Sequence, residues 1–137
     1  MNRTELQRLA KERISDAKVL LAARHWSGAY YMAGYAVECA LKACIAKLMK
    51  SEEFPDKKFA DKCWTHNLPQ LLDLAGLKAA FDAALRADPD LADNWDTVKE
   101  WTEESRYART AKAKAENLYE AITDRKHGVL SWLKRRW

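Results

Sequence analysis

Two charged residues interrupt the most apolar segment of the sequence. Between Ser27 and Ala46, Glu38 and Lys42 are the only charged side chains. They stand four residues apart with the glutamate first, which is the favourable order for an ion pair on a helix. A carboxylate on an apolar helix needs a partner, because burying it alone is costly. We favour a structural pair that fixes helix register. The alternative is a polar group that faces a cleft, with Arg106 or a ligand as second partner.

His66 is the second residue with possible chemistry. It follows Cys63 by three positions, a spacing that suits zinc, but the sequence has no second pair of this kind. We therefore predict no metal site and no cofactor. His66 also precedes Asn67, which can cap the next helix. A histidine at a helix start is more often a local hydrogen-bond partner than a catalyst, and we favour that role.

Arg106 and Tyr107 lie at the predicted junction between two helices. A guanidinium group binds phosphate and a tyrosine ring stacks on a base, so the pair suits a phosphate or a base. An internal ion pair of Arg106 with Glu38 or Glu104 is an equally open interpretation. The segment from Trp132 to Trp137 also alternates basic and aromatic residues, but cations in a last helical turn explain it better.

The sequence lacks the common nucleotide-binding and catalytic motifs. The sequence contains no P-loop, GxGxxG, HExxH or GxSxG pattern. Its three cysteines, Cys39, Cys44 and Cys63, show no CxxC spacing. We interpret them as small buried hydrophobic residues in a reducing cytoplasm.

These residues must be positioned by helices. The chain of 137 residues has only four glycines and three prolines, which predicts one all-α domain, an up-and-down bundle of about four to six helices. Apolar spacing predicts a helix from Thr4 to about Arg24, with Thr4 as possible N-cap, and a central helix from Ser27 to Lys50, with Ser27 as N-cap.

The second half of the chain is predicted to contain shorter elements. Residues 51–66 are expected to form a loop, followed by short helices near 68–75, ended by Gly76, and near 77–85. Asp88 and Pro89 predict a new helix, with Asp88 as N-cap, that continues to about Glu104. The last apolar stripe predicts one long helix bent near Gly128, and two helices with a break there are the second choice.

Charge is distributed unevenly along the chain. The net charge of +4 combines +3 for residues 1–25, +2 for 26–50, −7 for 51–104 and +6 for 105–137. We expect part of the excess charge to form internal or inter-subunit ion pairs. A phosphate ligand would bind near Arg106 and Arg109. No segment is long and apolar enough to predict a membrane span or a secretion signal.

Several of these segments together resemble one family. Residues 29–43, AYYMAGYAVECALKA, resemble the A-x-Y-x-x-x-x-A-x-E-x-x-L-K-A core of HEPN domains (higher eukaryote and prokaryote nucleotide-binding). The segment 65–68, THNL, is similar to the family's T-H-x-L element. Residues 101–107 resemble its R-Y segment, and residues 128–133 fit its closing helix.

The resemblance implies an all-α bundle that usually forms a homodimer, with a cleft near the interface for nucleotide or RNA. Many members are ribonucleases, often toxins, that use an Arg-x(4–6)-His motif at the last long helix, and others accompany a small nucleotidyltransferase. Here the positions that should hold the histidine after Arg106, 111–113, are Ala, Lys and Ala, and Arg125 is too close to His127.

We therefore expect a domain that binds nucleotide, RNA or a nucleotidyltransferase partner in a dimer cleft. Its candidate ligand-binding residues are Glu38, Lys42, His66, Arg106, Tyr107 and Arg109. The alternatives are a metal-independent ribonuclease toxin of a toxin–antitoxin pair and a helical assembly module without catalysis.

Overall fold

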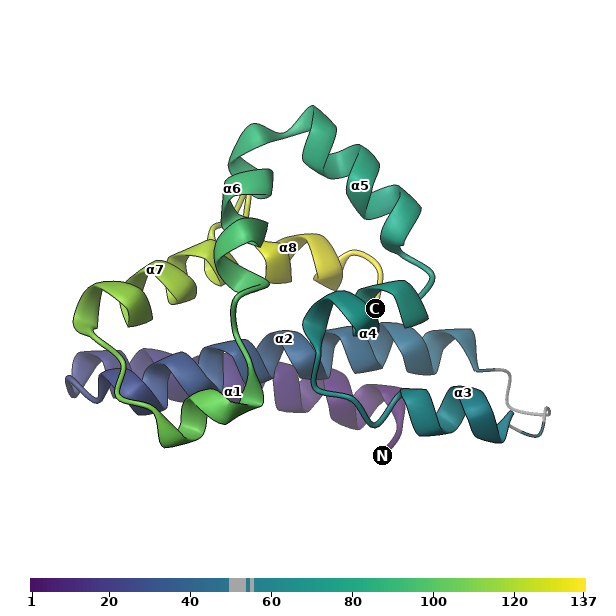
Figure 1. The fold of residues 1–137 in the computed structure, drawn as a ribbon, viewed down its shortest axis with the longest axis horizontal. Coiled ribbons are helices and arrows are strands. Elements are labelled where there is room, and N and C mark those ends of the chain that lie inside the picture. Colours follow the sequence, from purple (N-terminus) through teal and green to yellow (C-terminus); the bar gives the residue numbers. More distant parts are fainter. Residues whose placement is uncertain (50–53, 55) are drawn as a thin grey trace.

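The described part of the chain contains helices and no strands. The computed structural model describes residues 1–49, 54 and 56–137. Its elements are α1 (Arg3–Ala22), α2 (Trp26–Leu48), α3 (Lys57–Lys62), α4 (Leu68–Leu74), α5 (Lys78–Ala87), α6 (Pro89–Val98), the 3-10 helix η1 (Glu103–Tyr107), α7 (Lys112–Thr123) and α8 (Val129–Lys134) (Figure 1). The all-α prediction is confirmed, although the described residues form eight α-helices rather than four to six. None of the helices in these residues is long and apolar enough to cross a membrane.

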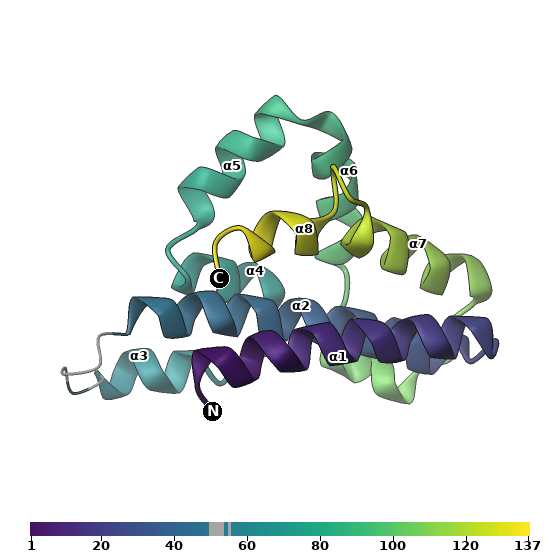
Figure 2. The ribbon, with the colours of Figure 1, turned by 180° about the vertical axis from the view of Figure 1, so that it is seen from behind.

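The two longest helices, α1 and α2, lie antiparallel and side by side along the base of the fold (Figures 1 and 2). Small side chains such as Ala10 and Ala17 are fully buried on α1 and allow close approach. The prediction of Thr4 as N-cap is wrong. Asn2 takes this position: its side chain accepts from the backbone N–H of Glu5 at 2.8 Å, and the Glu5 carboxylate accepts from the Asn2 N–H at 2.9 Å.

The central helix of the fold is α2. It contacts α1, α4, η1, α7 and α8, as its largely apolar surface predicts. The predicted N-cap is wrong, because α2 begins at Trp26 and the Ser27 hydroxyl instead accepts a hydrogen bond from the backbone N–H of Thr110 at 2.9 Å. This bond ties the start of α2 to the segment before α7. The predicted helix end at Lys50 lies outside the described residues.

The described part of the segment between α2 and α4 contains a helix that the sequence did not predict. Within residues 51–66, which were expected to form a loop, α3 forms with Asp56 as its N-cap. Positions 51–53 and 55 of that predicted loop lie outside the described residues. Asn67 caps α4 as predicted, accepting from the backbone N–H of Gln70 at 2.9 Å. The helix ends before Gly76, also as predicted.

An arch of two helices, α5 and α6, stands over the bundle (Figures 1 and 2). It rests on aromatic contacts: the Phe81 ring lies edge-on to Trp95 at 5.1 Å and to Trp132 of α8 at 4.7 Å between centroids. Asp88 and Pro89 begin α6 as predicted, but the helix ends at Val98 rather than near Glu104, and η1 forms separately after it.

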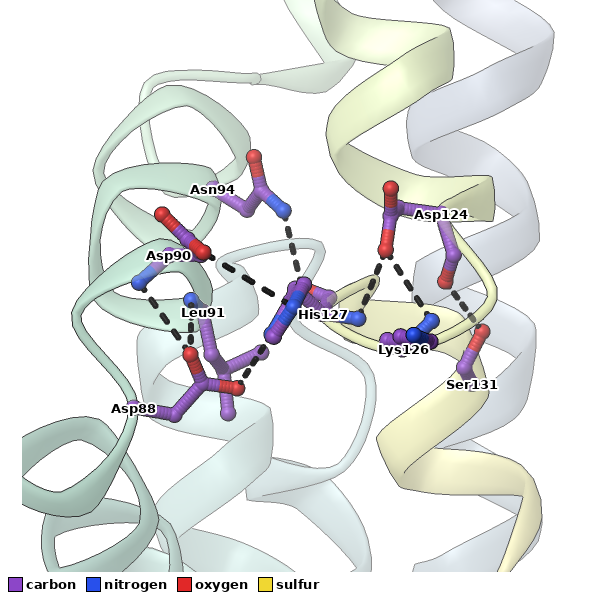
Figure 3. A network of polar contacts seen from close by, with 8 residues as sticks. All are labelled: Asp88, Asp90, Leu91, Asn94, Asp124, Lys126, His127 and Ser131. Atoms are coloured by element: carbon purple, nitrogen blue, oxygen red, sulfur yellow. Dashed lines mark hydrogen bonds and ion pairs between the residues drawn. The ribbon is translucent and has the colours of Figure 1, made fainter.

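The C-terminal segment consists of two helices, so the first prediction of one bent helix is wrong and the second is correct. Asp124 closes the turn between them: its carboxylate accepts from the backbone N–H groups of Lys126 and His127 at 3.0 and 2.7 Å (Figure 3). The Ser131 hydroxyl donates to the Asp124 carbonyl at 2.7 Å. A Cβ atom at Gly128 would overlap that carbonyl, so the turn requires glycine.

Candidate functional site

A buried carboxylate lies at the centre of α2. Glu38 is 2% exposed and is the one charged residue in the core among the described residues. Its Oε2 atom lies 3.3 Å from the Lys42 Nζ atom, and its Oε1 atom lies 2.7 Å from the His66 Nδ1 atom. The predicted pair with Lys42 is therefore confirmed. The second partner is His66 rather than Arg106, and the two partners together compensate the burial of the carboxylate.

His66 reaches α2 because the chain turns sharply between α3 and α4. The backbone N–H of Asn67 donates to the Thr65 hydroxyl at 3.2 Å while the Asn67 side chain caps α4, which fixes the backbone on the C-terminal side of the histidine. The outer ring nitrogen, Nε2, lies 3.0 Å from the Glu103 Oε2 atom on η1. The partners of His66 are thus distant in sequence, whereas we expected a local one.

The contacts form a continuous chain from Lys42 through Glu38 and His66 to Glu103. The inner end is buried, with the Glu38 side chain 3% exposed, while the side chains of His66 and Glu103 are 42% and 40% exposed. Each ring nitrogen of the imidazole faces a carboxylate oxygen, so any N–H that the ring carries has an acceptor. This series of side-chain contacts therefore connects the core of the protein to its surface.

A groove of about 580 Å³ runs along α2 beside this chain of contacts. Its polar lining consists of Glu38, Lys42 and His66, and the other lining residues are apolar or aromatic apart from the backbone. Three of them are well exposed: Met1 at 81%, Trp64 at 79% and Met49 at 45%. Apolar walls around a few convergent polar groups are typical of ligand sites.

Arg106 and Tyr107 lie on η1, the same element that carries Glu103. The Arg106 guanidinium stands 4.8 Å from the centroid of the Tyr107 ring, which is 79% exposed. Tyr107, and to a lesser extent Tyr31, raises the pKa of Arg106 above its ordinary value. No carboxylate in the described part of the chain forms an ion pair with this guanidinium, so the interpretation of Arg106 as an internal partner of Glu38 or Glu104 is wrong.

An aromatic row on α2 continues toward the groove. The Tyr31 and Tyr35 rings stack with centroids 6.1 Å apart, and Tyr31 also lies 6.1 Å from the Trp101 ring. Tyr31 is close to Arg106, and Tyr35 lines the groove next to Glu38. The row therefore connects the surface of η1 with the polar centre.

Arg109 is the predicted site residue that the structure places elsewhere. It lines a separate shallow hollow of about 350 Å³ together with Arg24, His25 and the first turn of α2. The six predicted residues thus divide into three groups. Glu38, Lys42 and His66 are in contact, Arg106 and Tyr107 are adjacent on η1, and Arg109 stands apart.

Sequence reasoning missed Glu103 as a member of the site. Its only sequence signal is its position three residues before Arg106, because its contact with His66 is purely tertiary. It also missed the contacts of His127, whose Nδ1 atom lies 2.7 Å from Asp88 Oδ2 and whose Nε2 atom lies 3.7 Å from Asp90 Oδ2 (Figure 3). The other Asp88 oxygen caps α6, so the Asp88 carboxylate joins the start of α6 to the turn before α8.

The three cysteines lie outside the contacts that run from Lys42 to Glu103, although Cys39 and Cys63 line the groove. Cys39 and Cys44 are buried, and Cys63 is half-buried; all three are free thiols. Burial, and for Cys39 also the neighbouring Glu38 carboxylate, raises the pKa of Cys39 and Cys44 to about 11. The interpretation of these two residues as small buried hydrophobic side chains is confirmed.

The long antiparallel pair α1–α2, its buried acid–imidazole contact and the 3-10 helix beside it define a helical domain with a polar group at its core. The sequence profile of the HEPN domain family matches residues 4–136, nearly the whole chain. The protein belongs to the HEPN domain family, which is generally associated with nucleotides and RNA. No curated protein and no solved structure gives a significant match.

Proposed function

We propose that this HEPN domain binds a nucleotide or RNA where α2, His66 and η1 meet. The observation that carries the proposal is the contact of His66 with Glu103, because it joins the groove beside Glu38 to the element that presents Arg106 and Tyr107. A phosphate would contact the exposed guanidinium of Arg106, and a base would stack on the Tyr107 ring. Arg109, in its separate hollow, offers a further basic position for a longer RNA.

The same groove supports the proposal of a homodimer. Its walls are mainly apolar, and exposed side chains such as Trp64 and Met49 stand at its edge. A second copy that covers these walls would leave the polar centre in a cleft between subunits. Sedimentation equilibrium tests this, and a monomer at high micromolar concentration would contradict the dimer without affecting ligand binding.

Titration of the protein with AMP, ATP and short single-stranded RNAs tests the proposed binding. We expect a rise in melting temperature and saturable binding by calorimetry. Arg106→Gln should weaken binding about tenfold or more, because a charge-assisted bond to phosphate is lost. The matched control is Arg86→Gln, which removes the same charge from an exposed position on α5. Equal affinities of the two variants would contradict the assignment of Arg106.

A ribonuclease activity is the second candidate, and the geometry of His66 favours it. A buried carboxylate holds the imidazole at Nδ1, and Nε2 lies on the exposed side next to Glu103, an arrangement that suits a general base once the Glu103 carboxylate has moved away from Nε2. Nε2 would take the proton of a 2′-hydroxyl whose oxygen attacks the phosphorus. The 5′-oxygen would leave with a proton from water, and Arg106 would stabilise the phosphorane.

This second candidate predicts RNA cleavage in EDTA with a 2′,3′-cyclic phosphate product. His66→Ala should abolish cleavage while the protein remains folded by circular dichroism. Growth arrest on expression, removed by Arg106→Ala, would support a toxin. Binding without cleavage would leave the first proposal as the function of the site.

A further inference from the structure

The outer nitrogen of His66 already has an anionic partner within the chain. Glu103 places a carboxylate oxygen 3.0 Å from Nε2, on the side of the ring that faces away from Glu38. The carboxylate comes from η1, a short 3-10 helix that also presents Arg106. The position that a ligand anion would take on His66 is therefore filled by the protein itself.

The two carboxylate contacts of His66 differ in strength. The Glu38 contact is made by a side chain that is 3% exposed, so water hardly competes with it. The Glu103 side chain is 40% exposed, and polar contacts between exposed side chains are weak because water competes with them. An incoming anion would therefore displace Glu103, while Glu38 keeps the ring in place.

The two elements that carry these carboxylates each also carry a cation. Lys42 lies next to the inner carboxylate in the same groove, and Arg106 stands three residues after Glu103 with no carboxylate partner among the described residues. A phosphate group accepts hydrogen bonds from the same donors as a carboxylate and has more acceptor oxygens. The chemistry of the position therefore fits a phosphate group.

We propose that Glu103 occupies the binding position of a ligand phosphate on His66 and must leave it when the ligand binds. The inference rests on the proposed function and names the contact at which that site takes its ligand. Glu103 lowers the affinity of the site in two ways, because it occupies the position beside Nε2 of His66 and repels the phosphate. Bound phosphate would replace its carboxylate at Nε2.

The test compares Glu103→Gln with Glu104→Gln. Both variants remove one negative charge from η1, and the Glu104 side chain forms no ion pair in the described part of the chain. Calorimetric titrations with inorganic phosphate, AMP and a short single-stranded RNA measure the affinity. We expect Glu103→Gln to bind about two- to fivefold more tightly than Glu104→Gln, the factor that corresponds to an exposed ion pair.

The gain should depend on His66. In a His66→Asn background, the Glu103→Gln change should give no more than the Glu104→Gln change, since the displaced contact no longer exists. If Glu103 acts only by holding η1 in place, its removal should instead weaken binding and lower the melting temperature. That result would overturn the inference.

The three probes distinguish the possible sources of the phosphate, and the wild type shows whether the site binds any of them. A gain with all three probes assigns the position to a phosphate group of any origin. A gain with AMP alone assigns it to a nucleotide, and a gain with RNA alone assigns it to a backbone phosphate. If the wild type binds and the two variants are equal, the inference alone fails. If neither the wild type nor Glu103→Gln binds any probe, the proposed function fails as well.

Discussion

The indole ring of Trp101 packs directly on the backbone of α2 at Gly34. Trp101 is 2% exposed, and a Cβ atom added to residue 34 would overlap three atoms of its indole. A glycine inside a helix costs about 0.5–1 kcal/mol relative to alanine. The glycine at this position in α2 is therefore required by packing, which holds the segment before η1 against the central helix.

Gly34→Ala should destabilise the protein by about 1–3 kcal/mol, even though alanine is the better helix former, because the rigid indole must move. Urea denaturation measures the change. The control is Gly28→Ala in the same helix, where a Cβ atom would meet only Leu20 at 3.4 Å. This variant should be neutral or more stable by up to about 1 kcal/mol. Equal effects of both variants would contradict the contact.

Glu38→Ala should lower the free energy of unfolding by about 1–3 kcal/mol. The change removes the buried acceptor that the partly exposed Lys42 amine and His66 imidazole share. Glu12→Ala is the matched control, because Glu12 pairs with Arg8 at 2.6 Å on an exposed surface of α1. We expect that control to change stability by less than about 0.5 kcal/mol. A loss no larger than that of the control would contradict the role of Glu38 in the core.

Local sequence signals predicted most of the elements but few of the contacts between them. Asn67 and Asp88 act as predicted caps because a cap depends only on the next few residues. The Glu38–Lys42 pair follows from helical spacing. Gly128 indicates the break before α8 in the sequence. The role of Asp124, whose carboxylate closes the turn, has no recognisable sequence pattern.

The candidate site was only partly predictable for the same reason. Glu38 is the one acidic residue in an apolar segment, and this pattern correctly predicts a buried group with a partner. Its pairing with His66, and that of His66 with Glu103, join three elements that sequence spacing cannot place. Arg109 was grouped with Arg106 because the two are close in sequence, whereas η1 and the segment after it direct them to different surfaces.

The three thiols should differ in reactivity. Because burial raises the pKa of Cys39 and Cys44 to about 11, about one molecule in a thousand carries either thiolate at pH 8. Cys63 is half-buried at the end of α3. A thiol reagent such as DTNB should therefore modify one cysteine of the native protein first and the other two only on unfolding. Cys63→Ser should remove the fast phase, and its persistence would contradict this assignment.

His127 should make the stability of the fold depend on pH. Its hydrogen bond to Asp88 is the largest cause that raises the pKa of His127 above 6.5, and the same bond is the largest cause that lowers the pKa of Asp88 below 3.8. Asp90 and Asp124 add to the rise for His127. Asn94 holds the same turn by donating to the His127 carbonyl at 2.8 Å (Figure 3). Protonation of the ring therefore strengthens the contact between α6 and the α7–α8 turn.

The raised pKa of His127 means that its contribution is complete below pH 6.5 and is lost as the pH rises through the raised value. The lowered pKa of Asp88 means that its contribution is complete above pH 3.8 and is lost as the pH falls through the lowered value. The pair should therefore stabilise the fold fully between these limits. Urea midpoints measured from pH 5 to pH 9 should fall less steeply for His127→Gln than for the wild type. The exposed His25→Gln serves as the control and should follow the wild type, and a His127→Gln curve parallel to the wild type would contradict the coupling.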